Sequence, residues 1–356
     1  GVNGYSYHAG NFQELANFHR RCFDIPIIAI GGSNGKTTTK NLLKSVLDKK
    51  YNTHCTQGNF NNHIGVPITL LNMPSDCEMA IIEVGTNNPG EIEELCSITA
   101  PNYGLITNIG KEHLEGFGTL EAVAKEESEI YHYLLKKQGT AFVNKDDEWL
   151  TRMSRAIENK VLFTKKETEI VSLVPHIKFN YKEQHFKSPL MGDYNLDNIL
   201  TAVCIGEHFN VSLINIAEAI AEYQPDNNRS QLIKRKSNTV WLDAYNANPS
   251  SMQKAIENFA MMPQQNKVLI LGDMFEMGIN ANLEHLELLK WTTKFDFATI
   301  YLLGDHFDAI SQNCGLNTYK SMEVLGQAIK QFNYKDTSFL IKGSRGMKME
   351  RVLNFL

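Results

Sequence analysis

The amino-acid sequence predicts an α/β protein with two sheet-containing domains, a central one with a mainly parallel sheet and a smaller, Rossmann-like one at the C-terminal end. Short apolar runs at residues 26–30, 79–84 and 103–108 alternate with segments of helical spacing. Such alternation is typical of a parallel sheet with helices on both faces. Four turn-forming residues at 225–228 separate this part from a second alternating region, which indicates a domain boundary.

The individual elements follow from local patterns of apolar residues. Helices are expected at residues 12–21, 36–49, 120–137, 195–209 and 213–222. In the C-terminal domain, strands are expected at residues 239–243, 267–271, 299–303 and 338–341. Residues 161–190 are rich in alternating and β-branched side chains, and we expect a short antiparallel insertion there. The predicted domains are residues 25–228 and 229–356, with residues 1–24 as a preceding linker helix.

Composition excludes several classes of function. The 356 residues carry a net charge of −5 without a long basic run, which argues against nucleic acid as a partner. No apolar stretch approaches the roughly 20 residues of a membrane-spanning helix, and we expect no membrane association. The six cysteines are scattered without a CxxC pair, so we expect reduced thiols in a cytoplasmic protein.

A glycine-rich turn directly follows the first buried strand, and a helix follows the turn. Glycines allow backbone N–H groups to converge on phosphates, and the helix N-terminus contributes a partial positive charge. Lys36 would reach the β- and γ-phosphates of a nucleotide, and the Thr37 hydroxyl would face Mg²⁺. The spacing is one residue shorter than GxxxxGK[ST], yet the order of elements predicts a P-loop-type ATPase domain that binds ATP with Mg²⁺. The nucleotide-binding residues expected in this turn are Gly32, Ser33, Asn34, Gly35, Lys36, Thr37 and Thr38.

The turn and six further segments resemble the Mur ligase family. Taken alone, the turn at residues 31–39 would also fit folylpolyglutamate synthetase and cyanophycin synthetase. The remaining segments resemble the branch of the family that adds D-Ala-D-Ala to UDP-muramoyl-tripeptide, and they occur in the family's order. These segments are residues 57–67, 83–91, 113–118, 243–249, 271–278 and 342–345.

The resemblance implies an ATP-dependent carboxylate–amine ligase of peptidoglycan synthesis. ATP would first phosphorylate a carboxylate, and an amine would then displace phosphate from the acyl phosphate. The implied substrates are UDP-MurNAc-tripeptide and D-Ala-D-Ala, and we expect a monomer. Two alternatives stay open, namely a Mur-like ligase for a non-UDP carboxylate and a non-catalytic, nucleotide-binding paralogue.

The resemblance also assigns roles to residues outside the phosphate loop. Glu83 would bind Mg²⁺ together with Thr37, and His113 would bind a second Mg²⁺. Asn195 and Asn198 would contact adenine, although Asn195 is also well suited to cap a helix. The residues implied for ATP in the C-terminal domain are Arg229 and Asp243, and those implied for the substrates are Asn61, Asn62, Ser344 and Arg345.

The sequence departs from the family's pattern in two places. The family's N-terminal domain, which binds UDP, is expected to contribute only its tail, within residues 1–24. Glu127 stands where relatives carry a lysine that CO₂ converts to a carbamate ligand of the second Mg²⁺. Lys125 lies two residues away, about 200° around the helix, and faces elsewhere. Glu127 is therefore expected to be a built-in carboxylate, the alternative being a solvated helix acid.

Overall fold

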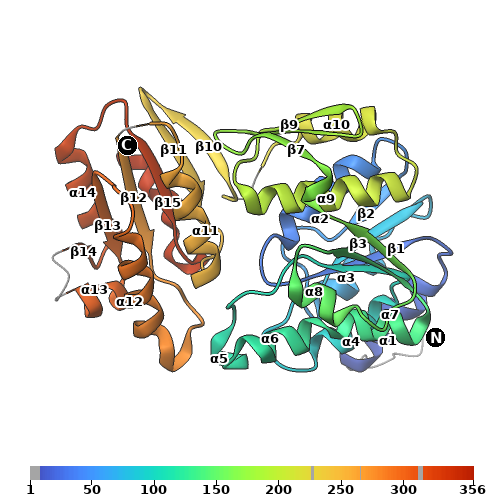
Figure 1. The fold of residues 1–356 in the computed structure, drawn as a ribbon. Coiled ribbons are helices and arrows are strands. Elements are labelled where there is room, and N and C mark those ends of the chain that lie inside the picture. The colour runs from blue at the N-terminus through green and yellow to red at the C-terminus, as the bar shows by residue number, and fades with distance from the viewer. Residues whose placement is uncertain (1–8, 226–227, 265, 312–315) are drawn as a thin grey trace, which may run out of the picture.

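The computed structural model describes residues 9–225, 228–264, 266–311 and 316–356. Two α/β units lie side by side, the central unit and the C-terminal unit (Figure 1), and the predicted fold class is confirmed. Residues 1–8, Asp226 and Asn227 of the predicted linker, and Cys314 lie outside the described residues. The other five cysteines are free thiols. No described helix has the length and apolar character needed to cross a membrane.

The central unit is built on a six-stranded parallel sheet. Its strands are β1 (Ile27–Gly31), β2 (Thr53–Cys55), β3 (Met79–Glu83), β4 (Tyr103–Ile106), β5 (Thr140–Asn144) and β6 (Lys160–Phe163). Their order is β2-β3-β1-β4-β5-β6. The first strand therefore lies between β3 and β4, and the strand order reverses there. Ligands of parallel α/β sheets bind beyond the carboxyl ends of the strands at such a position.

Alternating side chains of β1 pack into two separate cores, one on each face of the sheet. Ile28 and Ile30 belong to one core, and Ile27 and Ala29 belong to the other, because successive residues of a strand point to opposite faces. The first core is covered by α2 (Lys36–Leu47), α9 (Asp193–His208) and α10 (Leu213–Glu222). The second is covered by α1 (Ala9–Arg21), α3 (Gly65–Leu71), α4 (Glu91–Thr99) and α7 (Glu129–Lys137). Three shorter helices complete the unit: α5 (Leu114–Phe117), α6 (Leu120–Glu127) and α8 (Glu148–Met153).

The structure corrects the expected insertion at residues 161–190. Residues 160–163 form β6, which pairs in parallel with β5 at the edge of the main sheet. Only the remainder forms the antiparallel sheet, from β7 (Glu169–Ser172), β8 (Ile177–Tyr181) and β9 (Gln184–Ser188), preceded by the 3₁₀ turn η1 (Lys165–Glu167). A half-exposed parallel edge strand has the same alternating pattern as a hairpin strand, so the sequence could not separate them.

The prediction of one continuous helix at residues 120–137 is wrong. The segment is divided into α6 and α7 at Ser128. The Ser128 hydroxyl donates to the Lys125 carbonyl at 2.6 Å, and such local side-chain bonds compete with regular helical hydrogen bonding. The break follows directly after Glu127.

The C-terminal unit also contains a six-stranded sheet, in the order β10-β11-β15-β12-β13-β14. Only β10 is antiparallel to its neighbour. The strands are β10 (Gln231–Arg235), β11 (Asn238–Asp243), β12 (Lys267–Gly272), β13 (Thr299–Leu303), β14 (Asn317–Tyr319) and β15 (Ser338–Lys342). The helices are α11 (Pro249–Ala260), α12 (Ala281–Thr292), α13 (Asp305–Ser311) and α14 (Met322–Phe332), with 3₁₀ turns η2 (Gly278–Asn280), η3 (Arg345–Met347) and η4 (Met349–Phe355).

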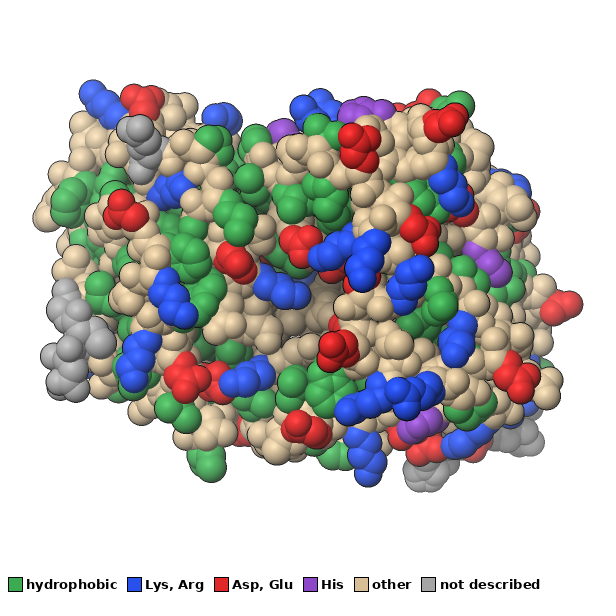
Figure 2. Space-filling view, viewed as in Figure 1, with side chains coloured by type: hydrophobic (Ala, Val, Ile, Leu, Met, Phe, Trp, Pro, Cys, Tyr) green, Lys and Arg blue, Asp and Glu red, His purple; other side chains and the backbone are tan. Residues whose placement is uncertain are grey.

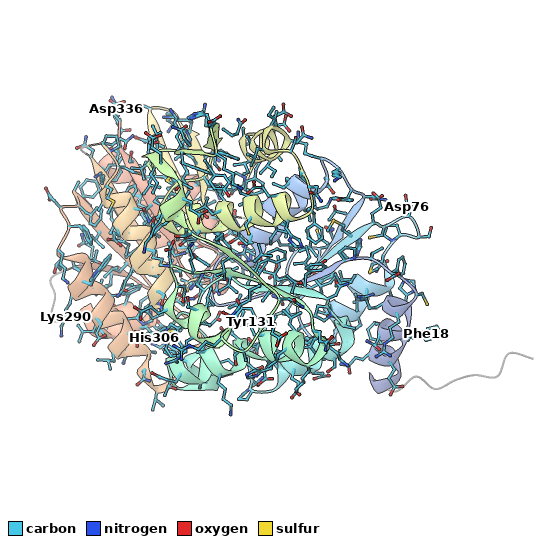
Figure 3. All side chains as sticks on the ribbon, turned by 45° about the vertical axis from the view of Figure 1, so that its right-hand side comes forward. Phe18, Asp76, Tyr131, Lys290, His306 and Asp336 are labelled. Carbon is cyan, nitrogen blue, oxygen red and sulfur yellow. The ribbon has the colours of Figure 1, made fainter. Side chains whose placement is uncertain are left out.

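The two units meet along α11, the loop after β12 and the segment before α5 (Figure 1). Figure 3 shows that Tyr131 lies in the central unit, while Phe18 and Asp76 lie at its outer side and Lys290 lies on the C-terminal unit. Residues that directly follow the carboxyl ends of β1, β3 and β4 line one cavity together with residues of the C-terminal unit, and the space between two units is where a ligand site is expected.

A substitution of Phe142 tests the packing of the central core. Its fully buried ring stacks on Tyr103 with centroids 6.0 Å apart. Phe142→Ala should lower the free energy of unfolding by about 3–5 kcal/mol, since it removes apolar contacts and leaves a cavity. Urea denaturation followed by circular dichroism measures this. Ile214→Ala is the control, because Ile214 is 61% exposed, and its effect should stay within about 0.5 kcal/mol. Equal losses in both variants would contradict the assignment of Phe142 to the core.

Candidate active site

A cavity of about 340 Å³ lies between the two units, and Figure 2 shows the hollow, with acidic and basic side chains around its mouth. Most of the site residues predicted from the sequence line it. These are Ser33, Asn34, Gly35, Lys36, Thr37, Thr38, Asn61, Asn62, Glu83, His113, Asn195, Asn198, Arg229 and Asp243. Gly32, Glu127, Ser344 and Arg345 are not among the lining residues.

The phosphate loop has the backbone geometry that its glycines allow. Gly32 and Gly35 have φ of 109° and 88°, which disfavours residues with a Cβ. A Cβ on Gly32 would also come within 2.3 Å of the Thr107 hydroxyl. Gly35 caps α2, and no side chain caps the first turn of that helix. The N–H groups of this turn are therefore available to an anion.

Lys36 lies beside several carboxylates. Its ammonium donates to the Gly32 carbonyl and lies 3.8 Å from Glu112 Oε2. Burial lowers the pKa of Lys36, but the negative charges of Glu112, Glu127 and Glu83 outweigh it and raise that pKa. Lys36 therefore keeps its positive charge at the base of the cavity.

Glu83 ends β3 and is buried, with 2% of its surface exposed. The Thr37 hydroxyl donates to Oε2 at 3.1 Å, and Asn61 Nδ2 donates to Oε1 at 3.0 Å. Lys40 Nζ forms an ion pair with the same carboxylate at 3.2 Å. The predicted pair of Thr37 and Glu83 is thus brought together beside the phosphate loop. A hydroxyl and one carboxylate next to nucleotide phosphates suit Mg²⁺.

His113 directly precedes α5. Its Nδ1 lies 2.6 Å from Glu276 Oε2 of the C-terminal unit, and its Nε2 lies 3.7 Å from Glu112 Oε2. Burial lowers the pKa of His113, but the hydrogen bond with Glu276 and the charges of Glu112 and Glu276 raise it overall. No group of three or more His, Cys, Asp or Glu in the described part of the chain could hold a metal ion. The second Mg²⁺ site predicted from the sequence rests on two of these side-chain types, His113 and Glu127, and it stays a prediction.

Glu127 is fully buried, which excludes the alternative of a solvated helix acid. Its Oε2 accepts the Gly32 N–H at 2.6 Å, and its Oε1 has no hydrogen-bond partner among the residues that the structure describes. Burial is the main reason that its pKa is raised to about 7; the charge of Glu112 adds to this, while Lys36 opposes it. Lys125 of the same helix is exposed, as predicted. A buried carboxylate therefore faces the back of the phosphate loop.

The two predicted adenine contacts lie together inside α9. Asn198 Nδ2 donates to Asn195 Oδ1 at 3.1 Å, and Thr39 Oγ1 donates to Asn198 Oδ1 at 3.1 Å. The helix cap is Gly192, so Asn195 is not the cap. Thr39 on the phosphate-loop helix holds the asparagine pair at one end of the cavity.

The C-terminal unit contributes an arginine and an aspartate to the lining of the cavity. The Arg229 guanidinium lies 3.5 Å from the centroid of the Tyr245 ring, a cation–π arrangement. Asp243 forms an ion pair with buried Lys342 and accepts the Ser230 N–H at 3.3 Å. The cavity therefore combines groups from both units.

The sequence analysis assigned no role to several other residues that line the cavity, and the charged or aromatic ones among them include Glu112, Tyr194, Lys254 and Lys342. Glu112 directly precedes His113, and Lys342 begins the segment 342–345, so both were adjacent to recognised motifs. Their participation depends on side-chain direction, which the sequence pattern does not report.

Ser344 and Arg345, predicted to contact the incoming dipeptide, have other partners. Ser344 Oγ accepts the Phe275 N–H at 2.8 Å. Arg345 is exposed and pairs with Glu350 at 3.0 Å. Their contact with a dipeptide stays a prediction.

The geometry can be compared with known proteins. Residues 30–206 match the Mur ligase middle domain, and residues 228–345 match the Mur ligase, glutamate ligase domain. The UDP-N-acetylmuramoyl-tripeptide–D-alanyl-D-alanine ligase of Bacillus subtilis (strain 168) is 31% identical over 360 residues, spanning 97% of this chain and 78% of the relative. The chain belongs to the Mur ligase family. The resemblance predicted from the sequence motifs is confirmed.

Solved Mur ligases have the same fold. MurF from Acinetobacter baumannii superposes with a TM-score of 0.88 at 28% identity, over 99% of this chain and 83% of that one. MurF ligase from Thermotoga maritima in complex with ADP superposes with a TM-score of 0.87 at 25% identity, over 100% of this chain and 86% of that one. The arrangement of the two units is therefore shared with Mur ligases of known structure.

The raised pKa of Glu127 predicts a pH-dependent stability difference. In the folded protein the pKa of the Glu127 carboxyl is about 7, whereas that of an ordinary glutamate is 4.5. As pH rises through this window, the unfolded chain ionises first, and the parent loses stability by at most about 1.4 kcal/mol per pH unit. Glu127→Gln, which cannot ionise, should therefore melt at increasingly higher temperature than the parent between pH 4.5 and 7. Above that window the gain should level off.

Differential scanning fluorimetry over this pH range measures the difference. Glu121→Gln, on the exposed side of the same helix, is the control and should follow the parent at every pH. A Glu127→Gln gain that does not change with pH would contradict the raised pKa.

Proposed function

We propose that this Mur ligase joins the carboxylate of UDP-MurNAc-tripeptide to the amine of D-Ala-D-Ala, with hydrolysis of ATP to ADP and phosphate, in peptidoglycan synthesis. One observation carries the proposal. A single cavity is lined by the phosphate loop, the Thr37–Glu83 pair and Arg229 of the other unit. The similarity to ligases of that name over nearly the whole chain supports the choice of substrates.

The reaction takes place in two steps. A carboxylate oxygen of the acceptor attacks the γ-phosphorus of ATP, ADP leaves, and an acyl phosphate forms. The dipeptide amine then attacks the acyl carbon, the C–O bond to phosphate breaks, and phosphate departs with that electron pair while the amine loses a proton. Since phosphoryl transfer needs little covalent help from the protein, the residues mainly position and stabilise charge.

Each wall of the cavity has a distinct task in this scheme. The free N–H groups at the start of α2 and the Lys36 ammonium bind the nucleotide phosphates. Thr37 and Glu83 would hold Mg²⁺, which when bound neutralises negative charge on those phosphates. Asn61 is held by Glu83 at 3.0 Å, which supports a role for the 61–62 segment in orienting the acceptor beside the phosphoryl group.

The nucleotide would bridge the two units. Asn195 and Asn198 are proposed to contact adenine from the central unit, and Arg229 and Asp243 are proposed to contact ATP from the C-terminal unit. Binding on both sides of one cavity favours the closed arrangement of the two units, because a ligand stabilises the state that contacts it most.

Phosphate release tests the activity. With ATP, Mg²⁺, UDP-MurNAc-tripeptide and D-Ala-D-Ala, we expect release that depends on both substrates and yields one pentapeptide per phosphate. Lys36→Ala should lower the rate by about 100-fold or more, as expected when a charged stabiliser of the transition state is removed. It should also abolish the ATP-induced rise in melting temperature.

Lys44→Ala is the matched control, since Lys44 lies on the same helix and pairs with Asp48 at the surface; it should keep both properties. Turnover only with a carboxylate that lacks UDP would reassign the acceptor. Absence of hydrolysis with every acceptor would refute the ligase.

Glu127 is proposed to replace the carbamate of relatives as a built-in carboxyl group, which a bound Mg²⁺ would keep ionised although burial raises its pKa to about 7. Its burial and its unpartnered Oε1 support this. Carbamates form reversibly from CO₂, so ligation by this protein should be unchanged when bicarbonate is removed. Glu127→Gln should slow acyl phosphate formation by about 10-fold or more and leave ATP binding nearly intact, with Glu121→Gln as the unaffected control. A parent that needs bicarbonate, or a Glu127→Gln variant that matches the parent across a Mg²⁺ titration, would contradict this role.

A further inference from the structure

The loop of the C-terminal unit that carries Glu276 contacts the start of α5 in the central unit. The Glu276 carbonyl accepts the Glu115 N–H at 3.1 Å, and the Glu276 carboxylate lies 2.6 Å from His113 Nδ1. Gly278 packs against the same segment, since a Cβ there would lie 3.1 Å from Glu115 Cα. Both the backbone and the side chain of Glu276 therefore reach across the boundary between the units.

The two partners are held in backbone conformations that side-chain-bearing residues seldom adopt. His113 has φ of 46° and Glu276 has φ of 62°. Such conformations cost about 1–3 kcal/mol each and persist where the surroundings impose them. The loop is fixed within its own unit, because the Met274 N–H donates to His285 Nε2 at 2.9 Å and the Phe275 N–H donates to Ser344 Oγ at 2.8 Å. Glu276 is thus presented by a rigid support.

The contact has a consequence for the His113 ring. When Nδ1–H donates to a carboxylate, the neutral ring keeps its lone pair on Nε2. Here Nε2 lies on the side of Glu112, whose Oε1 is buried with no hydrogen-bond partner in the described part of the chain. Both residues line the cavity. A carboxylate behind a histidine commonly fixes both ring orientation and tautomer for work at the other nitrogen.

We propose that Glu276 is a positioning residue that sets the His113 ring, with Nε2 directed into the cavity, when the C-terminal unit closes on the central unit. The assignment deepens the proposed ligase function and rests on it. The reactive geometry around His113 then forms only in the closed arrangement, so that phosphoryl transfer is coupled to closure. An open enzyme would bind ATP at the phosphate loop without a correctly oriented His113.

A neighbouring contact provides a matched control. Lys111 Nζ pairs with Glu284 at 2.7 Å across the same boundary, without touching His113. Glu284→Gln removes one carboxylate from the interface, as Glu276→Gln does. If Glu276 only helped the two units to close, both variants would have similar effects on the His113 ring and on kcat. If Glu276 sets the ring, only Glu276→Gln changes the His113 tautomer.

The ring tautomer is measured by ¹⁵N NMR of the histidine-labelled 356-residue protein with Mg²⁺ and ADP. The pH is alkaline, so that the His113 ring is neutral although its pKa is raised, and His113 is assigned by its loss in His113→Asn. We expect protonated Nδ1 and lone-pair-bearing Nε2 in the parent and in Glu284→Gln. In Glu276→Gln we expect a mixed or reversed tautomer. In the same variant, kcat for ligation should fall about 10–100-fold, the usual effect of removing such a partner, while the ATP-induced melting shift stays at the parent's value. Glu276→Asp should restore part of the parent's tautomer preference.

An unchanged His113 tautomer in Glu276→Gln would overturn the proposal, as would equal ring signals and equal kcat losses in Glu276→Gln and Glu284→Gln. Failure of the proposed function gives a different result, since the parent itself would then show no ligation with the two substrates. Melting temperature without ligand confirms that each variant is folded.

Discussion

The buried ion pair between Lys40 and Glu83 is the interaction on which the geometry of the site depends. Lys40 Nζ lies 3.2 Å from the carboxylate and donates to the Gly58 carbonyl at 3.0 Å. Only 1% of Lys40 is exposed. Removing one partner of such a pair leaves an uncompensated buried charge and costs about 3–5 kcal/mol. Lys40 therefore ties together the phosphate-loop helix, the end of β3 and the loop that carries Asn61.

This anchoring is possible because of the position of β1 in the sheet. With β3 on one side and β4 on the other, the phosphate loop, Glu83 and the segment that leads to His113 all leave the sheet at the same edge. The C-terminal unit covers this edge and adds Arg229, Asp243 and Lys342 to the cavity. The central unit thus supplies the phosphate site, and the boundary between the units completes it.

Acidic side chains surround the phosphate loop more closely than the motifs alone suggest. Glu112 and Glu127 are both buried, and each has one oxygen without a hydrogen-bond partner. Buried unpaired carboxylate oxygens are costly, so they persist where a cation or a substrate group can pair with them. The charge of Lys36 offsets part of this cost.

The sequence by itself determined the α/β class, the phosphate loop, the family and about half of the residues that line the cavity. These follow from local patterns, namely buried strands, glycines that permit positive φ, and motifs of fixed spacing. Tertiary structure decided what local patterns do not contain. It placed β6 in the main sheet, divided a helix at Ser128, turned Glu127 inward against Gly32, and paired His113 with Glu276. Each of these depends on packing between segments far apart in the chain, where burial and hydrogen-bond partners are set by neighbours that no short stretch of sequence specifies.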